Sequence, residues 1–130
     1  ADYKSFKNVV YASDLKDANK ELGILIPFAQ IFDSKIHMVH VVSAIDMKVE
    51  AQRKVIEAMI HQSGYTKIDF KLLINEDVPV AIDRYIQEMK ADLLTTFTHE
   101  LSLYEKLFGL SITRKLAYQG RIPLLAFKRK

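Results

Sequence analysis

Short apolar runs alternate along this chain with segments whose apolar residues recur every three or four positions, and no other feature restricts the fold as strongly. Short apolar runs are typical of buried strands, and the wider spacing is typical of helices that lie on a core. Strands that alternate with helices favour a parallel sheet covered by helices. We therefore predict an α/β fold, with a five-stranded parallel sheet and helices on both faces. The expected strands are Asn8–Ser13, Lys35–Val42, Lys67–Ile74, Asp92–Phe97 and Ile122–Phe127.

The helices are expected in the segments between these strands. Pro27 lies inside the first of them and is expected to kink it or delay its start, because proline disturbs a helix interior. Asp77 is expected to cap the third helix, with Pro79 in its first turn. The apolar residues expected to face the core are Val55, Ile56, Met59 and Ile60 in the second helix and Ile82, Ile86 and Met89 in the third. The predicted helices are Ala18–Phe32, Val49–Ser63, the segment after Asp77, and Ser111–Tyr118, with a helical turn over Tyr104–Phe108.

The composition is that of one ordinary globular domain over residues 1–130, with 49% hydrophobic and 27% charged residues. Cysteine is absent, which excludes disulfides and thiolate metal sites and favours a reducing compartment, so we expect a cytoplasmic protein. The formal net charge is only +3, and basic residues are scattered among acidic ones, so no nucleic-acid surface is predicted. No apolar run approaches the ~20 residues of a membrane span.

Two of the expected strands have the character of sheet edges. Lys67–Ile74 alternates apolar residues with Asp69 and Lys71, which indicates a half-exposed edge strand. Ile122–Phe127 is uniformly apolar and comes last in the chain, where a fold of this type places its other edge. An uncovered apolar edge invites pairing with another chain. We therefore expect a homodimer, or pairing with a tandem neighbour, through Ile122–Phe127.

A small-molecule site is expected where the strands end. Ligands of open α/β sheets bind outside the carboxyl ends of the strands, where the strand order reverses. The loops that begin at Asp14, Ser43 and Thr98 are therefore the candidates.

Neither metal binding nor catalysis is predicted from the sequence. The four histidines, His37, His40, His61 and His99, lack the spacing that metal sites favour, and His37 and His40 should point to opposite faces of a strand. Ser13, Ser102 and Ser111 lie near the expected cleft, but no nucleophile-elbow motif is present, and a serine at a helix start is usually a cap. We therefore do not expect an enzyme.

A series of short fragments is spread in a fixed order along the chain. They are Val9–Asp14, Pro27–Ala29, His37–Val42, Ala81–Ile82, Ala91–Leu94, Thr98–His99, Ser111–Thr113 and Ile122–Leu125. Their order and spacing together resemble the universal stress protein family over nearly the whole chain. The resemblance implies a Rossmann-like domain of the adenine nucleotide alpha hydrolase type, which agrees with the fold predicted above.

The resemblance also implies a nucleotide cleft that has lost part of its motif. Many members bind ATP through a Gly-x2-Gly-x9-Gly-Ser/Thr loop after the fourth strand. Here Phe97, Glu100 and Leu110 take the three glycine positions, while Ser111 keeps the last one. Asp14 matches the acidic residue that contacts the nucleoside, and Ala12 and Val41 match positions that line the adenine pocket. The remnant site implied in this way consists of Ala12, Asp14, Val41, Thr98, His99 and Ser111.

The lost glycines predict a weak phosphate site. A non-glycine residue held in the left-handed region costs roughly 1–2 kcal/mol, and Glu100 would bring a carboxylate toward the phosphates. We therefore expect a non-catalytic stress-response domain without a cofactor, which has a degenerate nucleotide cleft and acts through dimerisation or protein association. An ATP- or AMP-binding signalling module that uses Asp14, Val41 and Ser111 remains the alternative.

Overall fold

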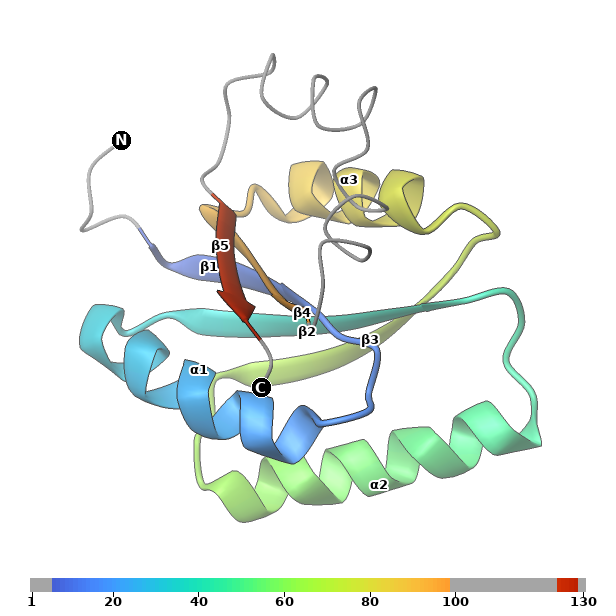
Figure 1. The fold of residues 1–130 in the computed structure, drawn as a ribbon, viewed down its shortest axis with the longest axis horizontal. Helices are drawn as coiled ribbons and strands as arrows, with labels where there is room; N and C mark the ends of the chain where they lie inside the picture. Colours follow the sequence, from blue (N-terminus) through green and yellow to red (C-terminus); the bar gives the residue numbers. More distant parts are fainter. Residues whose placement is uncertain (1–5, 99–123, 129–130) are drawn as a thin grey trace.

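The computed structural model describes residues 6–98 and 124–128, and it confirms an α/β fold built on a parallel sheet. Five strands pair in the order β3-β2-β1-β4-β5, and all four pairings are parallel (Figure 1). The order puts β3 at one edge and β5, the last strand, at the other. The strands are β1 (Asn8–Ala12), β2 (Lys35–Val42), β3 (Ile68–Ile74), β4 (Leu93–Thr98) and β5 (Leu124–Lys128).

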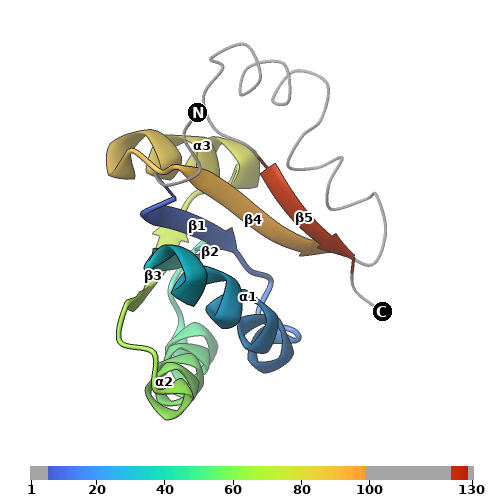
Figure 2. The ribbon, with the colours of Figure 1, turned by 90° about the vertical axis from the view of Figure 1, so that its left-hand side faces the viewer.

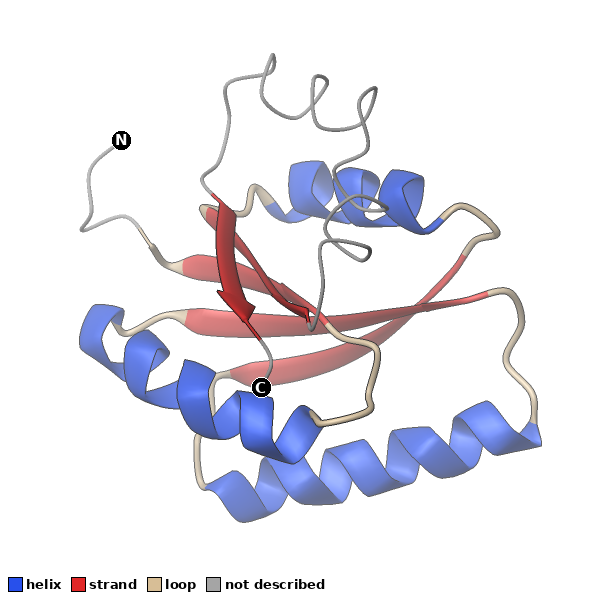
Figure 3. Ribbon diagram, in the orientation of Figure 1, coloured by secondary structure: helices blue, strands red, loops and turns tan. Residues whose placement is uncertain are grey.

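In the described residues, three helices cover the two faces of this sheet. They are α1 (Ala18–Phe32), α2 (Met47–Ser63) and α3 (Val78–Met89). Figure 2 shows α1 and α2 on one side of the strands and α3 on the other, and Figure 3 shows the same three layers by element type. The helix predicted over Ser111–Tyr118 and the turn over Tyr104–Phe108 lie outside the described residues. None of the helices in the described ranges has the length and apolar character needed to cross a membrane.

The core is divided into two layers by the sheet. Between the sheet and α1 and α2, the buried residues include Tyr11, Leu22, Leu25, Met38 and Phe97. Between the sheet and α3 they include Val10, Ala12, Val39, Ile82 and Leu94. The two lists alternate along β1 and β4, since successive side chains of a strand point to opposite faces.

Several predicted boundaries and faces require correction. α2 begins at Met47 rather than Val49, because Asp46 caps it by accepting the backbone N–H of Val49 at 2.8 Å. Val55 does not face the core, since it is 61% exposed while its neighbour Ile56 is buried. The apolar face of α3 ends at Ile86, and Met89 is 39% exposed at the last turn. β1 stops at Ala12, one residue before the predicted end.

The remaining helix predictions concern Pro27 and Asp77. Pro27 lies inside α1, which extends from Ala18 to Phe32 as one helix. Its surroundings are exposed, so the backbone carbonyl that proline cannot satisfy has access to water. Asp77 caps α3 as expected, accepting the N–H of Val80 at 3.2 Å.

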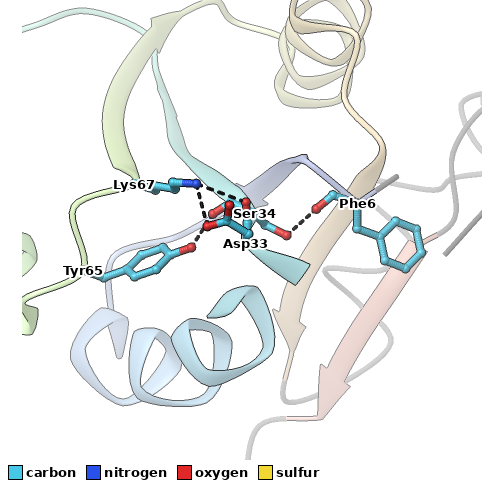
Figure 4. A network of polar contacts seen from close by, with 5 residues as sticks. All are labelled: Phe6, Asp33, Ser34, Tyr65 and Lys67. Carbon is cyan, nitrogen blue, oxygen red and sulfur yellow. Dashed lines mark hydrogen bonds and ion pairs between the residues drawn. The ribbon is translucent and has the colours of Figure 1, made fainter. Parts of the chain in front are cut away.

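A polar network ties the amino ends of the first three strands together (Figure 4). Lys67, just before β3, donates to Oδ1 of Asp33 at 2.6 Å, and this ion pair lowers the pKa of Asp33. Tyr65 donates its hydroxyl to the carbonyl oxygen of Ser34, and Ser34 donates to that of Phe6. These contacts lie at the end of the sheet opposite to the predicted ligand site, so they serve the fold.

Candidate functional site

A pocket of about 170 Å³ lies at the carboxyl ends of β1 and β2, on the face of the sheet that α3 covers. β2 and β3 lie on one side of β1 in the sheet, and β4 and β5 lie on its other side. The pocket is therefore beside the point where the strand order reverses, which is where such sheets bind ligands. Its lining residues are Ala12, Ser13, Asp14, Val39, His40, Val41, Val78 and Ile82.

Three of the predicted site residues meet in this pocket. Ala12 ends β1, Asp14 follows it in the β1–α1 loop, and Val41 is near the end of β2. Ala12 and Val41 pack in the α3 core layer, so they contribute apolar surface. Asp14 is half-buried and contributes a carboxylate at the rim. Ala12, Asp14 and Val41 therefore lie together in one pocket, and their contact with a nucleoside stays a prediction.

The β1–α1 loop is fixed by local hydrogen bonds. Oγ of Ser13 accepts the N–H of Leu15 at 3.0 Å, and Oδ1 of Asp14 accepts the N–H of Lys16 at 3.0 Å. Leu15 has a φ of 68°, a left-handed conformation that is unfavourable for a non-glycine residue. Because a strained backbone conformation needs support from its surroundings, these two bonds explain how the loop holds its shape.

His40 anchors the same loop to β2. Its Nδ1 lies 2.8 Å from the carbonyl oxygen of Ser13, and a carbonyl can only accept, so Nδ1 carries the proton. The backbone N–H of Ser13 also donates to the carbonyl of Val39 at 2.9 Å. These contacts hold Ser13 and the adjacent Asp14 against β2. His40 thus has a positioning role that the sequence did not reveal.

Phe97 does not have the strained conformation that its alignment with a loop glycine suggested. It lies within β4 and is not among the described residues with positive φ. Its side chain is 2% exposed in the α1 layer, where its ring meets that of Tyr11 edge-on with centroids 5.6 Å apart. The strain expected at Phe97 from this alignment is therefore absent, since β4 continues past it and directs its ring to the opposite face of the sheet.

The other predicted site residues follow β4. The backbone of Thr98 ends β4 and pairs in register with Lys128 of β5. His99 and Ser111 lie outside the described residues, as do Glu100 and Leu110, so their place relative to the pocket stays a prediction.

Sequence reasoning missed part of the pocket wall. Val39 and Val78 line it together with Ile82, which had been expected only as a core residue. Val39 is two residues from Val41 on the same strand, so the period of two already put both on one face. Val78 is 40% exposed at the start of α3, and only the tertiary fold brings it beside β1.

The pocket suits one flat ring with polar groups at its edge. Its walls are mostly aliphatic, and its volume is close to the ~150 Å³ of an engineered cavity that binds benzene. Drug-sized ligands generally occupy clefts of roughly 300–1,000 Å³, so a whole nucleotide would extend beyond it.

These observations define a doubly wound α/β domain with a small apolar cleft beside its switch point. Comparison with solved structures shows which α/β fold this is: it is the fold of the universal stress proteins. A member of that family from Burkholderia pseudomallei is 20% identical with a TM-score of 0.67, and the match covers 98% of each chain.

Two further matches were solved with nucleotides. A universal stress protein in complex with cAMP is 15% identical with a TM-score of 0.66, and the match covers 94% of this chain and 97% of that one. The protein from Archaeoglobus fulgidus in complex with dAMP is 16% identical with a TM-score of 0.63, covering 93% and 97%. No family model and no curated protein matches the sequence.

Proposed function

We propose that this chain is a non-catalytic domain of the universal stress protein type that holds the adenosine part of an adenine nucleotide and acts by pairing with a like domain. The observation that carries the ligand proposal is the pocket that Ala12, Asp14 and Val41 line together. Two aliphatic walls hold a ring by burial of apolar surface, and a carboxylate at the rim accepts hydrogen bonds from sugar hydroxyls.

The neighbours in complex with cAMP and dAMP support an adenine ring as the ligand. Both are adenine nucleotides with a single phosphate. Their folds match this one over nearly the full chain. The same ring in the pocket described here would lie over Ala12, between Val41 and the start of α3.

We do not propose that the site binds the phosphates of a nucleotide tightly. β4 continues to Thr98 in register with β5, so the backbone at Phe97 and Thr98 belongs to a parallel strand pair. A phosphate loop instead turns its N–H groups toward the anion. The aligned Glu100 would add a repulsive charge.

Pairing is proposed through β5, which lies at an edge of the sheet. The segment Ile122–Phe127 is apolar throughout. A second copy or a tandem domain that pairs along this edge would add a strand beside β5 and extend the sheet.

The second candidate is a module that binds the whole of ATP or AMP for signalling. The assembled Ala12, Asp14 and Val41 favour it as much as they favour adenosine alone. Thermal melting with and without millimolar magnesium-ATP separates the two, since tight binding of ATP raises Tm by several degrees and weak binding leaves it unchanged.

The pocket is tested by filling its floor. Ala12→Val adds two methyl groups beneath the proposed ring and is expected to weaken adenosine binding by about tenfold or more in calorimetry. Ala58→Val, an exposed change on α2, is the matched control and should bind like the wild type. Circular dichroism verifies that both variants fold. Unchanged binding by Ala12→Val would place the ligand elsewhere.

A further inference from the structure

One side of α2 carries a row of exposed apolar residues. The row, called the α2 stripe below, consists of four residues spaced three or four positions apart: Met47, Ala51, Val55 and Ala58. Residues at this spacing share one side of a helix. All four are exposed, with Met47 at 90% and Val55 at 61%, whereas Ile56 on the side toward the sheet is buried. Figure 1 shows α2 along the lower border of the molecule, with no other described helix or strand beyond it.

Two lysines border the α2 stripe. Lys48 lies three residues before Ala51 and Lys54 lies three residues after it, which puts the two lysines on opposite sides of the stripe. Both are exposed, and neither forms an ion pair with a residue that the structure describes. The stripe is therefore complementary to a second apolar stripe that carries negative charge along both of its sides.

The acidic residues in this part of the helix do not neutralise the two lysines. The carboxylate of Asp46 caps α2, and Glu50 pairs with Arg53 at 3.4 Å. Glu57 lines a groove beside β3, away from the stripe. The charge next to the stripe is thus positive on both sides.

A helix suits the α2 stripe better than a lipid surface does. Two of the four residues are alanines, which let a second helix approach to the usual distance of roughly 8–10 Å between axes. The same alanines bury little apolar area, and membrane binding by an amphipathic helix scales with that area. A second copy of α2 would bring the same lysines toward its own, and like charges oppose association.

We propose that the α2 stripe docks an amphipathic helix of a partner protein whose apolar side is bordered on both sides by Asp or Glu. Met47 and Val55 pack between apolar side chains of that helix, and Lys48 and Lys54 pair with its acids. A single helix pair forms a small interface, so the binding is weak and transient. The stripe and the pocket lie on different faces of the sheet, so this proposal stands or falls separately from the proposed function.

The probe is a synthetic helical peptide of about three heptads, with Leu at positions a and d and Glu at positions e and g. A peptide with Lys at e and g and a scrambled acidic peptide are the matched probes. Binding is measured by fluorescence anisotropy at about 0.15 M salt, where distant charges are screened. The acidic peptide should bind the wild type with a Kd below about 0.5 mM, and the other two should bind at least about tenfold more weakly.

Three variants test which residues hold the peptide. Lys48→Glu/Lys54→Glu should bind the acidic peptide about tenfold more weakly or worse, and should prefer the lysine peptide. Lys20→Glu/Lys71→Glu, which changes the net charge equally on α1 and β3, should bind within about twofold of the wild type. Val55→Gln should weaken binding by about fivefold through lost apolar burial. The substituted side chains are all exposed, so Tm should stay near the wild-type value in each variant.

Three results would overturn the proposal. The first is the absence of saturable binding by the acidic peptide, or an equal loss of binding in the two double variants. The second is a fall in the sedimenting mass of Lys48→Glu/Lys54→Glu, because the stripe is then an interface between copies of this chain. The third is binding of the wild type, but not of that variant, to vesicles of phosphatidylserine and phosphatidylcholine without any binding of the peptide.

Discussion

The hydroxyl of Tyr11 donates a hydrogen bond of 2.5 Å to Oε1 of Glu21, and both side chains are buried between β1 and α1. Burial raises the pKa of Tyr11, and the bond to Glu21 raises it further, so the phenol keeps its proton. Glu21 is only 2% exposed in a layer that is otherwise mostly apolar. The phenol therefore supplies part of the solvation that the carboxyl group loses on folding.

Tyr11→Phe is expected to lower the free energy of unfolding by about 1–3 kcal/mol, because it removes a donor from a buried carboxyl group. Urea denaturation measures the change. Tyr65→Phe is the control, since Tyr65 is only half-buried and donates to a backbone carbonyl. If both variants lose the same free energy of unfolding, the Tyr11–Glu21 hydrogen bond stabilises the fold no more than the Tyr65 bond does.

Substitution of two glycines by alanine should change the stability of the protein in opposite directions. Gly23 lies inside α1, and a Cβ there would meet no atom within 4 Å, so Gly23→Ala should stabilise the protein by about 0.5–1 kcal/mol. Gly64 ends α2 with a φ of 78°, again with open space around it. Gly64→Ala should therefore destabilise by about 1 kcal/mol through backbone strain alone. A midpoint that falls in Gly23→Ala, or rises in Gly64→Ala, would contradict the prediction for that glycine.

His37 predicts a loss of stability in mildly acidic solution. It is 5% exposed, with Nε2 3.0 Å from Oδ1 of Asn8 and Nδ1 3.4 Å from the hydroxyl of Tyr85. Burial, and then the charge of Lys35, lower its pKa. Between that lowered value and the ordinary value of about 6.5, the unfolded chain binds more protons than the folded one. The free energy of unfolding should therefore fall as the pH drops below about 6.5, and level off below the folded pKa.

Denaturation at a series of pH values tests this, with His37→Gln expected to flatten the curve below about pH 6.5. His61→Gln is the control, because His61 is exposed on α2. A curve that keeps its slope in His37→Gln would assign the loss to other groups.

If the protein forms a dimer through β5, a charged substitution on that strand should convert the dimer to a monomer. Leu125→Lys puts a charge on the edge strand, where charge opposes pairing with another chain. Sedimentation should show a dimer for the wild type and a monomer for the variant. Lys71→Glu on β3, the opposite edge, should leave the dimer intact. A wild type that sediments as a monomer at micromolar concentration would contradict a stable homodimer.

The strands and helices of the sheet and its two covering layers were predicted well, because their apolar residues recur at regular spacing. α1 and β2 have the predicted bounds, and the half-exposed strand is at an edge. Glu21 was missed, although it lies three residues after Ala18 and four before Leu25 and so shares their buried face. Val55 was misplaced because it and Ile56 both lie at helical spacing to Met59, and only the tertiary packing decides between them.

The candidate site could be predicted only where strands determine it. The loop that begins at Asp14 follows from the strand ends, whereas Ala12 and Val41 were implied only by the resemblance to the universal stress protein family. Phe97 was misjudged because the alignment treated it as part of a loop, whereas β4 continues past it and directs its ring into the other layer.

The central claim is that the cleft holds adenosine without holding a phosphate chain. Calorimetric titration of the wild type with adenosine, AMP and magnesium-ATP tests it most directly. Dissociation constants within about fivefold of one another are predicted, because the phosphates add little binding energy. ATP that binds about a hundredfold more tightly than adenosine, or adenosine that does not bind at all, would contradict it.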